Sequence, residues 1–301
     1  MLDKLEILLA LARERHFGRA AERCGVSQPT LSAGLKQLEE SLGVLLVSRG
    51  SRFQGFTPEG ERVLTWARRI VGDARAMREE IEALQHGLSG RLRIAAMPTA
   101  LAAVAPLTTP FRAKYPNVRF TVWSRTSEEI LALLENLEID AGITYLDHDP
   151  VGRVMTMPLY QESYCLLTAA EAPLGHRATA TWSEVSKVPL CLLTPDTQNR
   201  RIIEGLLRNA GGRKQPTLES DSILLLFSHA RTGQWASVIP ASMADTLGVI
   251  EPLRAIPIVE PKQVHTVGLV MSPREPMTPL NAAFAEEARR IAAAQPAQSG
   301  A

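Results

Sequence analysis

Cysteine is scarce in this sequence of 301 residues, where only Cys24, Cys165 and Cys191 occur. An odd, sparse set without metal-ligand spacing argues against a disulfide framework and against a zinc site. It indicates a reducing compartment, which we take to be the cytoplasm. Cys165 and Cys191 stand in apolar, strand-like runs. We therefore expect buried, inert thiols there, and a redox pair between them is the alternative.

Long apolar runs and a strong charge of one sign are also missing. No stretch approaches the ~18 apolar residues of a membrane span, and the N-terminus lacks the pattern of a signal peptide, so no membrane partner is expected. The net charge of +1 does not by itself point to nucleic acid. Locally, however, six cations stand against three carboxylates between Arg15 and Arg52. This excess fits either a phosphate-binding surface or an ordinary solvated helix face.

Catalytic signatures are absent as well. Neither a GxSxG motif, a P-loop, a set of zinc ligands nor a pair of carboxylates occurs at a persuasive spacing. The six histidines are scattered, and isolated histidines usually satisfy local hydrogen bonds or face water. The sequence therefore predicts a protein that is not an enzyme, without catalytic or metal-binding residues.

Two amphipathic segments around a tight turn are the clearest positive signal near the N-terminus. Gly25 can end the first segment in the left-handed conformation, Ser27 is the expected N-cap of the second, and Pro29 suits its first turn. One face of the second helix should be core, because it carries Leu31, Leu35, Leu38 and Leu42. The opposite face carries the predicted DNA contacts Ser27, Gln28, Pro29, Thr30, Ser32 and Lys36. This pattern is typical of a helix-turn-helix whose second helix enters a major groove.

A basic wing is predicted to follow that helix. Residues 45–47 read as a short strand, and the chain returns along residues 53–56. Arg49 and Arg52 would then lie at the tip, where they contact phosphates or enter the minor groove. The alternative is that both arginines only keep the surface soluble.

A long helix is expected from Thr57, its N-cap, to about His86. Its apolar residues follow a heptad seam: Val63, Ala67, Ile70, Ala74, Met77, Ile81 and Leu84. Such a stripe can pack on its own domain. Because it links a DNA reader to the rest of the chain, we favour a homodimer with two recognition helices one DNA turn, or a multiple of it, apart.

After a break at residues 87–90, strands and helices alternate, which predicts an α/β domain. Strands at 92–96, 118–124 and 139–144 with helices between them imply a parallel sheet with right-handed crossovers. A second lobe follows, and a strand at 264–271 and a helix at 278–294 return to the first. The predicted domains are a winged helix-turn-helix at 1–58, a linker helix at 59–89 and a two-lobed Rossmann-like effector domain at 90–301, with lobe one at 90–162 and 267–295 and lobe two at 163–266.

The stretch AAERCGVSQPTLSAGLKQLEESLGVLLVSR, followed by FTPEG, resembles the N-terminal signature of LysR-type transcriptional regulators. Leu46-Val47 is aliphatic where an apolar-aromatic pair is usual, and Ala33-Gly34 replaces bulkier polar residues. The resemblance implies a periplasmic-binding-protein-like effector domain, double-stranded promoter DNA and RNA polymerase as partners, and a homotetramer. The chain also looks similar to regulators of formate dehydrogenase genes, which makes formate a candidate ligand.

Effector contacts are expected where helices begin beyond the carboxyl ends of strands. The resemblance places three such turns across a cleft between the lobes, with two further residues on its wall. The predicted contacts are Thr99, Ala100, Arg125, Thr126, Ser127, Thr144, Tyr145, Pro195, Thr197, Gln198 and Asn199. Hydroxyls at helix N-termini suit a small carboxylate, although Thr99, Ser127 and Thr197 could each be no more than a helix cap. Arg125 and Arg200 could pair an anion or face solvent.

These features together predict a ligand-responsive, sequence-specific transcriptional regulator that needs no cofactor beyond its small-molecule effector. The alternative is a small-molecule binding or sensor protein without DNA-dependent function, in which only residues 91 onward would matter. The N-terminal module favours the regulator. The operator, the target genes and the direction of regulation do not follow from the sequence.

Overall fold

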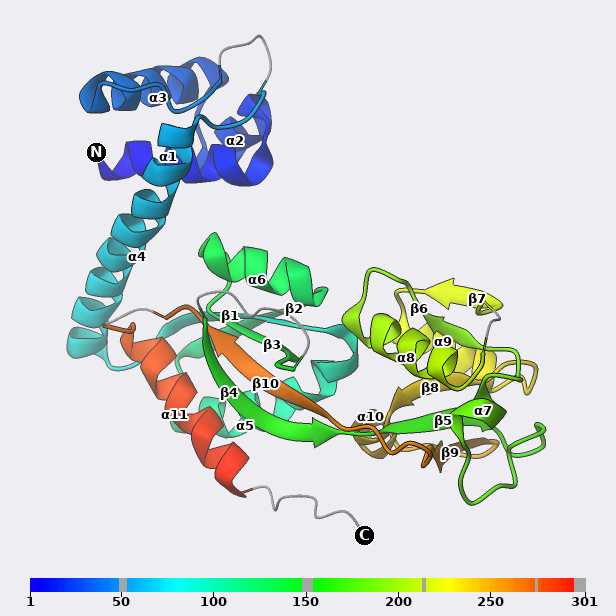
Figure 1. Cartoon of the computed structure of the whole chain (residues 1–301). Coiled ribbons are helices and arrows are strands. Elements are labelled where there is room, and N and C mark those ends of the chain that lie inside the picture. The colour runs from blue at the N-terminus through cyan, green and yellow to red at the C-terminus, as the bar shows by residue number, and fades with distance from the viewer. Residues whose placement is uncertain (49–52, 148–153, 213–214, 274–275, 295–301) are drawn as a thin grey trace. The chain divides into compact units, whose positions relative to one another are not determined.

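The computed structural model describes residues 1–48, 53–147, 154–212, 215–273 and 276–294. The chain forms two compact units, one made mainly of residues 1–88 and the other mainly of the residues that follow (Figure 1). None of the described helices is both long and apolar enough to cross a bilayer.

Four helices build the N-terminal unit: α1 (Leu2–Glu14), α2 (Phe17–Cys24), α3 (Gln28–Leu42) and α4 (Pro58–His86). Gly25 ends α2 in the left-handed conformation at φ 67°, and the Ser27 side chain accepts a hydrogen bond from the amide of Thr30 at the start of α3. Both predicted signals of the helix-turn-helix are thus confirmed. The predicted core face of α3 is right for Leu31, Leu35 and Leu38, which are buried, and wrong for Leu42, which is 41% exposed.

Two glycines allow helices to approach their neighbours closely. A Cβ on Gly34 would lie 2.8 Å from Cδ1 of Ile7, at the flexible end of that side chain, so a larger residue here would require Ile7 to shift. A Cβ on Gly60 would lie 2.1 Å from the backbone oxygen of Leu46, so only glycine lets α4 begin against the base of the wing. The departure noted at Gly34 therefore lies where α3 faces Ile7 of α1, whereas Gly60 faces backbone that cannot move aside.

The base of the wing is narrower than predicted. Val47 and Phe56 form a single antiparallel bridge, and the amide of Ser48 donates to the carbonyl of Gly55 at 3.0 Å. The two segments therefore meet at one bridge instead of forming two strands. The predicted tip, with Arg49 and Arg52, lies outside the described residues.

Lobe one of the second unit is a five-stranded sheet in the order β2-β1-β3-β10-β4. Its strands are β1 (Gly90–Ala96), β2 (Val118–Ser124), β3 (Ala141–Tyr145), β4 (Met155–Glu162) and β10 (His265–Met271). Its helices are η1 (Pro98–Ala103), α5 (Val104–Lys114), α6 (Ser127–Glu135) and α11 (Pro279–Ala294). β1 pairs in parallel with β2 and β3, as predicted, but β10 runs antiparallel to β3 and β4, so the sheet is mixed. The reversal follows because β10 enters the sheet from lobe two.

Lobe two contains an antiparallel sheet in the order β8-β5-β9 and a parallel pair, β6-β7, which one bridge between Leu190 and Ala236 links to the region of β8. Its strands are β5 (Tyr164–Ala169), β6 (Cys191–Leu193), β7 (Leu218–Ser220), β8 (Ser237–Pro240) and β9 (Leu253–Pro257). Its helices are α7 (Trp182–Val185), α8 (Gln198–Asn209), α9 (Ile223–Ala230) and α10 (Ala241–Leu247). The sequence did not predict α7, α10 or β9. Two crossings join the lobes, from β4 to β5 and from β9 to β10, as expected.

Candidate functional site

The outer face of α3 is open. The side chains predicted to contact DNA are exposed on it or at its N-cap: Ser27, Gln28, Pro29, Thr30, Ser32 and Lys36. The hydroxyls of Ser27 and Thr30 lie 2.8 Å apart, so the N-terminal turn is fixed while the following positions stay free. A helix held by buried leucines on one side and open on the other can dock in a major groove.

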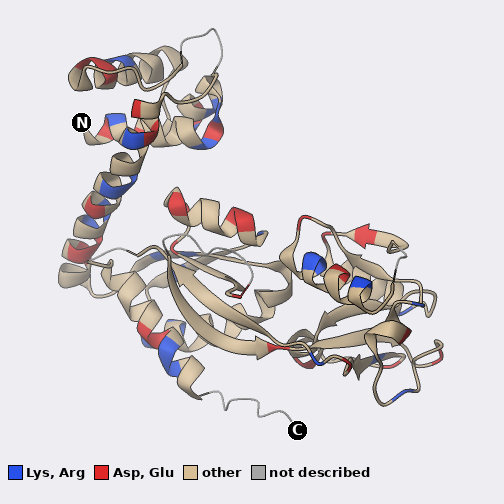
Figure 2. Cartoon of the chain, in the orientation of Figure 1, with Lys and Arg blue, Asp and Glu red and all other residues tan. Residues whose placement is uncertain are grey.

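Glu39 ties α3 to the base of the wing. Its carboxylate accepts hydrogen bonds from the amides of Leu46 at 2.8 Å and Val47 at 3.3 Å. Glu39, one of the three carboxylates between Arg15 and Arg52, therefore has a structural role at the base of the wing. Figure 2 marks both signs of charge on α3, where Lys36 also lies 3.8 Å from Glu40.

From Trp66 onward, α4 carries a stripe of apolar side chains that the described residues leave exposed. We call this set the α4 stripe; its exposed fractions are 60% at Trp66, 45% at Ile70, 56% at Met77, 49% at Ile81 and 83% at Leu84. Ala67 of the predicted seam is instead fully buried, and Val63 packs against the core of its own unit. The sequence pattern missed Trp66, which stands four residues before Ile70.

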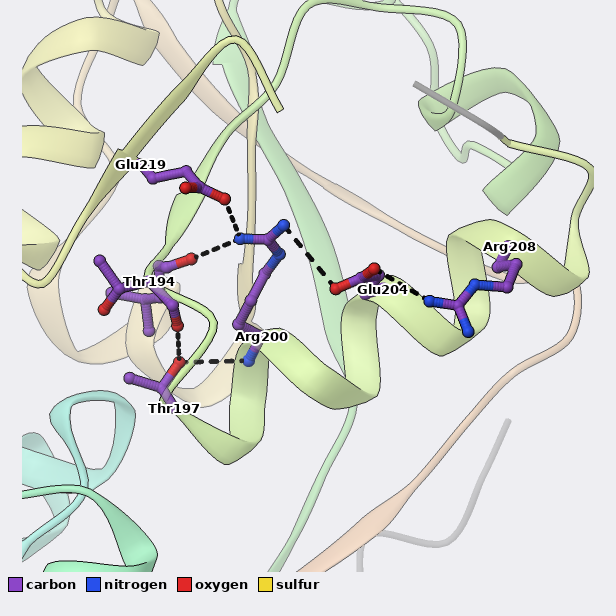
Figure 3. Close-up of polar contacts among 7 residues, drawn as sticks. Thr194, Thr197, Arg200, Glu204, Arg208 and Glu219 are labelled. Carbon is purple, nitrogen blue, oxygen red and sulfur yellow. Dashed lines mark hydrogen bonds and ion pairs between the residues drawn. The ribbon is translucent and has the colours of Figure 1, made fainter. Parts of the chain in front are cut away.

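The N-terminal turn of α8 is held by a buried arginine (Figure 3). Arg200 is 2% exposed and donates to the carbonyl of Leu193 at 3.0 Å and to the carboxylate of Glu219 at 2.6 Å. Thr197 caps the helix, accepting from the amide of Arg200 and donating to the carbonyl of Thr194. Arg200 therefore fixes the turn that presents Gln198 and Asn199, and its charge is already paired.

A buried polar cluster lies where the lobes join. The Tyr145 hydroxyl, at the end of β3, donates to Glu162 at the end of β4 and accepts from the Asn199 amide of α8 at 3.1 Å. Tyr164, the first residue of β5, brings its hydroxyl to 3.4 Å from that of Tyr145. We call Tyr145, Glu162, Tyr164 and Asn199 the crossing cluster. It connects both lobes through one tyrosine oxygen.

Burial decides the protonation of this cluster. It raises the pKa of Glu162 to about 8, despite the opposing hydrogen bond from Tyr145. It also raises the pKa values of Tyr145 and Tyr164 well above the ordinary range, helped by the nearby carboxyl of Glu162. At neutral pH Glu162 is therefore mostly a neutral acid, since a buried carboxylate without a cation is costly.

Several other predicted effector residues make hydrogen bonds at the turns that begin α6 and α8. Ser127 accepts a hydrogen bond from Thr144 at 2.8 Å in a buried pair, and Gln198 accepts from Arg201 at 2.7 Å. Arg201 in turn reaches Glu128 of lobe one at 3.1 Å. One ion pair therefore links the first turns of α6 and α8, whereas the predicted effector contacts stay predictions.

The remaining predicted residues divide into buried and exposed positions. Thr99 and Ala100 are buried in η1. The suggestion that Thr99 caps this helix is wrong, because the helix begins at Pro98 and Met97 takes the cap position. Among the described residues no hydrogen bond satisfies the Thr99 hydroxyl. Arg125 and Pro195 are exposed, and Thr126 makes a reciprocal cap with Glu129.

Sequence reasoning missed Glu162 and Tyr164. Both stand at the crossing between β4 and β5, where Glu162 ends one strand and Tyr164 begins a strand that is buried throughout. The available signal was a glutamate at the end of an apolar strand, directly where the chain was expected to change lobes. His265, the cross-strand partner of Glu162 on β10, lies with its ring centroid 6.0 Å from that of Tyr145.

The cysteines are unsuited to rapid oxidation. Burial raises the pKa of Cys165 to about 12 and that of Cys191 to about 11. Burial also raises the pKa of Cys24, which is half-buried. Because the thiolate is the reactive form, these thiols are poor nucleophiles at neutral pH.

Two family models account for both units of the chain. Residues 2–61 match "Bacterial regulatory helix-turn-helix protein, lysR family", and residues 85–293 match "LysR substrate binding domain". The chain belongs to the LysR family. As a LysR-type protein it is a DNA-binding transcriptional regulator with an effector-binding domain, and not an enzyme.

This LysR-type regulator is similar to proteins named for their response to peroxide. It is 27% identical to the hydrogen peroxide-inducible genes activator of Dickeya chrysanthemi, over 91% of this chain and 90% of that protein. The identity and coverage are the same for the DNA-binding transcriptional dual regulator OxyR of Escherichia coli K12.

Solved structures share the fold of this LysR-type chain over nearly its whole length. A full-length OxyR from Pseudomonas aeruginosa with a cysteine replaced by aspartate has a TM-score of 0.74 and 27% identity, covering 96% of this chain and 97% of that one. CbnR in complex with its target DNA has a TM-score of 0.62 and 22% identity, covering 97% of this chain and 99% of that one.

Proposed function

We propose that this regulator reads a promoter with the open face of α3 and is switched by a small molecule bound between the lobes of its effector domain. The observation that carries the proposal is the pairing of two features in one chain. α3 leaves its polar face open, and the crossing cluster joins both lobes at a single buried tyrosine oxygen. A ligand that prefers one lobe arrangement shifts the population toward it.

DNA recognition divides into two kinds of contact. Gln28 and Ser32 on α3 would read base edges, whereas Arg49 and Arg52 remain predicted phosphate contacts in the wing. The related fold of CbnR has been solved with target DNA, which supports the same use of this module. A protein of this kind works where the chromosome lies, consistent with the cytoplasm expected from the sequence.

The α4 stripe supports a homodimer. Exposed apolar side chains at heptad-like spacing are typical of a helix that pairs with a second copy. The resemblance adds a homotetramer and contact with RNA polymerase, and both stay predictions. A dimer would present two α3 helices to a two-fold symmetric operator.

We still predict that the effector is a small carboxylate. Formate is one candidate, and the corresponding role would be regulation of formate dehydrogenase genes. The names of the relatives suggest peroxide as a second signal. The raised pKa values of Cys165 and Cys191 argue against thiol oxidation as the trigger in this chain. We therefore favour reversible binding over oxidation.

A gel shift with the DNA upstream of its own gene tests the regulator against the alternative of a sensor without DNA function. We expect specific retardation that persists in the presence of competitor DNA. If no retardation is seen at moderate salt, the alternative of a sensor without DNA function is favoured. Thermal shifts with formate and other small carboxylates test the effector site, because a bound ligand stabilises the form it binds. Thr99→Val should abolish the rise in Tm.

A further inference from the structure

Within the described residues, the Glu162 side chain has one hydrogen-bond partner and no ion pair with a lysine or arginine. It is fully buried at the end of β4, and its Oε1 accepts from the hydroxyl of Tyr145. Within the described part of the chain, Oε2 makes no hydrogen bond, and no lysine or arginine pairs with the carboxyl. A buried polar atom without a partner costs free energy, so something that accepts or donates a hydrogen bond is favoured at this oxygen.

Among the described residues, no lysine or arginine is paired with Glu162, and the groups that face it are three tyrosines, one histidine and one amide. Tyr145 faces it from β3, Tyr160 from its own strand and Tyr164 from β5, and burial raises the pKa of each tyrosine. His265 is its partner on β10. From α8 the nearest linked group is the neutral amide of Asn199, through Tyr145. With Oε1 accepting from Tyr145, the acid proton belongs on Oε2, where it is a free hydrogen-bond donor.

Two of the arginines near the turns that begin α6 and α8 are already paired with carboxylates. Arg200 pairs with Glu219 at 2.6 Å, and Arg201 pairs with Glu128 at 3.1 Å. Arg125 is exposed and donates to the backbone oxygen of Ser124 at 2.7 Å. Among the described residues of lobe one, the hydroxyl of Thr99 and Oε2 of Glu162 are buried without a hydrogen-bond partner, and both belong to groups that can donate a proton while neutral.

We propose that Glu162 binds the effector as a neutral acid, donating its proton in a hydrogen bond to a small carboxylate, so that each complex retains one proton. The inference rests on the effector site proposed above and adds the chemistry of its recognition. A carboxylate accepts a hydrogen bond from a neutral acid without adding a second negative charge to the buried cluster. A carboxylic acid kept neutral by its apolar surroundings is an established kind of donor to anionic oxygen.

Calorimetric titration of the full chain with sodium formate, acetate and benzoate at pH 7 and pH 9 tests this proposal. All three probes are ionised at both values, so any change belongs to the protein. With the pKa of Glu162 at about 8, the neutral fraction falls about tenfold between these values, and the affinity of the probe that binds should fall by the same factor. Glu162→Gln, which is neutral at every pH, should bind with an affinity that no longer changes between pH 7 and pH 9.

Three outcomes would overturn the proposal. An affinity that is constant or rises from pH 7 to pH 9 would show that Glu162 binds as an anion or not at all. A tenfold fall that persists in Glu162→Gln would assign the proton to another group. Failure of all three carboxylates to bind at pH 7 would exclude the ligand class. Glu171→Gln, an exposed acid in lobe two, is the matched control and should keep the dependence of the native chain. Retardation of promoter DNA without ligand is a separate readout, so failure here is distinguishable from failure of the regulator function.

Discussion

Replacing Glu162 by glutamine should change how the stability of the effector domain depends on pH. The native state holds a proton on Glu162 up to about pH 8, whereas the unfolded chain releases it near the ordinary value of 4.5. Across that window the unfolded state binds fewer protons, so the native chain loses stability as the pH rises. The loss between pH 5 and pH 9 amounts to about 4 kcal/mol. Glutamine carries no proton to lose and escapes this penalty.

Urea titrations of both proteins at pH 5, 7 and 9 measure the effect. Tryptophan fluorescence can follow the effector domain, because Trp182 is buried with its ring centroid 5.9 Å from that of Tyr164. We expect the unfolding free energy of Glu162→Gln to rise relative to the native chain by about 4 kcal/mol from pH 5 to pH 9. A difference that stays constant across this range would refute the neutral acid. Glu171→Gln should run parallel to the native chain throughout.

Five further predictions come from the structure and the sequence. Gly60→Ala forces a Cβ to within 2.1 Å of a backbone oxygen and should cost about 1–3 kcal/mol in thermal unfolding of the N-terminal unit. Met77→Glu places a charge in the α4 stripe and should shift sedimentation from dimer to monomer without lowering helix content. Gln28→Ala should reduce the difference in binding free energy between operator and unrelated DNA by about 1–3 kcal/mol. Arg49→Ala should instead weaken binding to both DNAs and reduce the slope of log affinity against log salt concentration by about one. Hydrogen peroxide should leave operator binding unchanged, and a gel shift of the fully reduced protein before and after treatment checks this.

The helix-turn-helix could be predicted because its signals are local. Gly25 and Ser27 each act within one turn of a helix, through a left-handed conformation and a cap that depend on nearest neighbours. The leucine spacing failed only at Leu42, the last residue of α3, where the helix projects beyond its core. Capping and periodicity describe a helix well until it leaves its neighbours.

The effector domain could be predicted as a class but not in its sheet order. β1, β2 and β3 follow from alternation, whereas the antiparallel insertion of β10 depends on a return path through lobe two. The crossing cluster draws on residues that stand far apart in sequence, from Tyr145 to Asn199. No local sequence pattern indicates that the Tyr145 hydroxyl donates to Glu162, so the protonation of Glu162 follows from the tertiary structure and not from the sequence.

Similarity over a whole chain is stronger evidence for the fold than for the molecule that is sensed, because sensing depends on a few side chains. The relatives carry names that point to peroxide, yet burial raises the pKa values of Cys165 and Cys191 to about 12 and 11, several units above neutrality. Groups so far from their titration do not change state under ordinary conditions. The pKa of Glu162 is raised to about 8, close enough to neutral pH that a ligand preferring one protonation state could change it. At pH 7 a change of protonation takes about 1.4 kcal/mol at Glu162 but about 5–7 kcal/mol at either buried thiol, so Glu162 is the group that even a weakly bound ligand could switch.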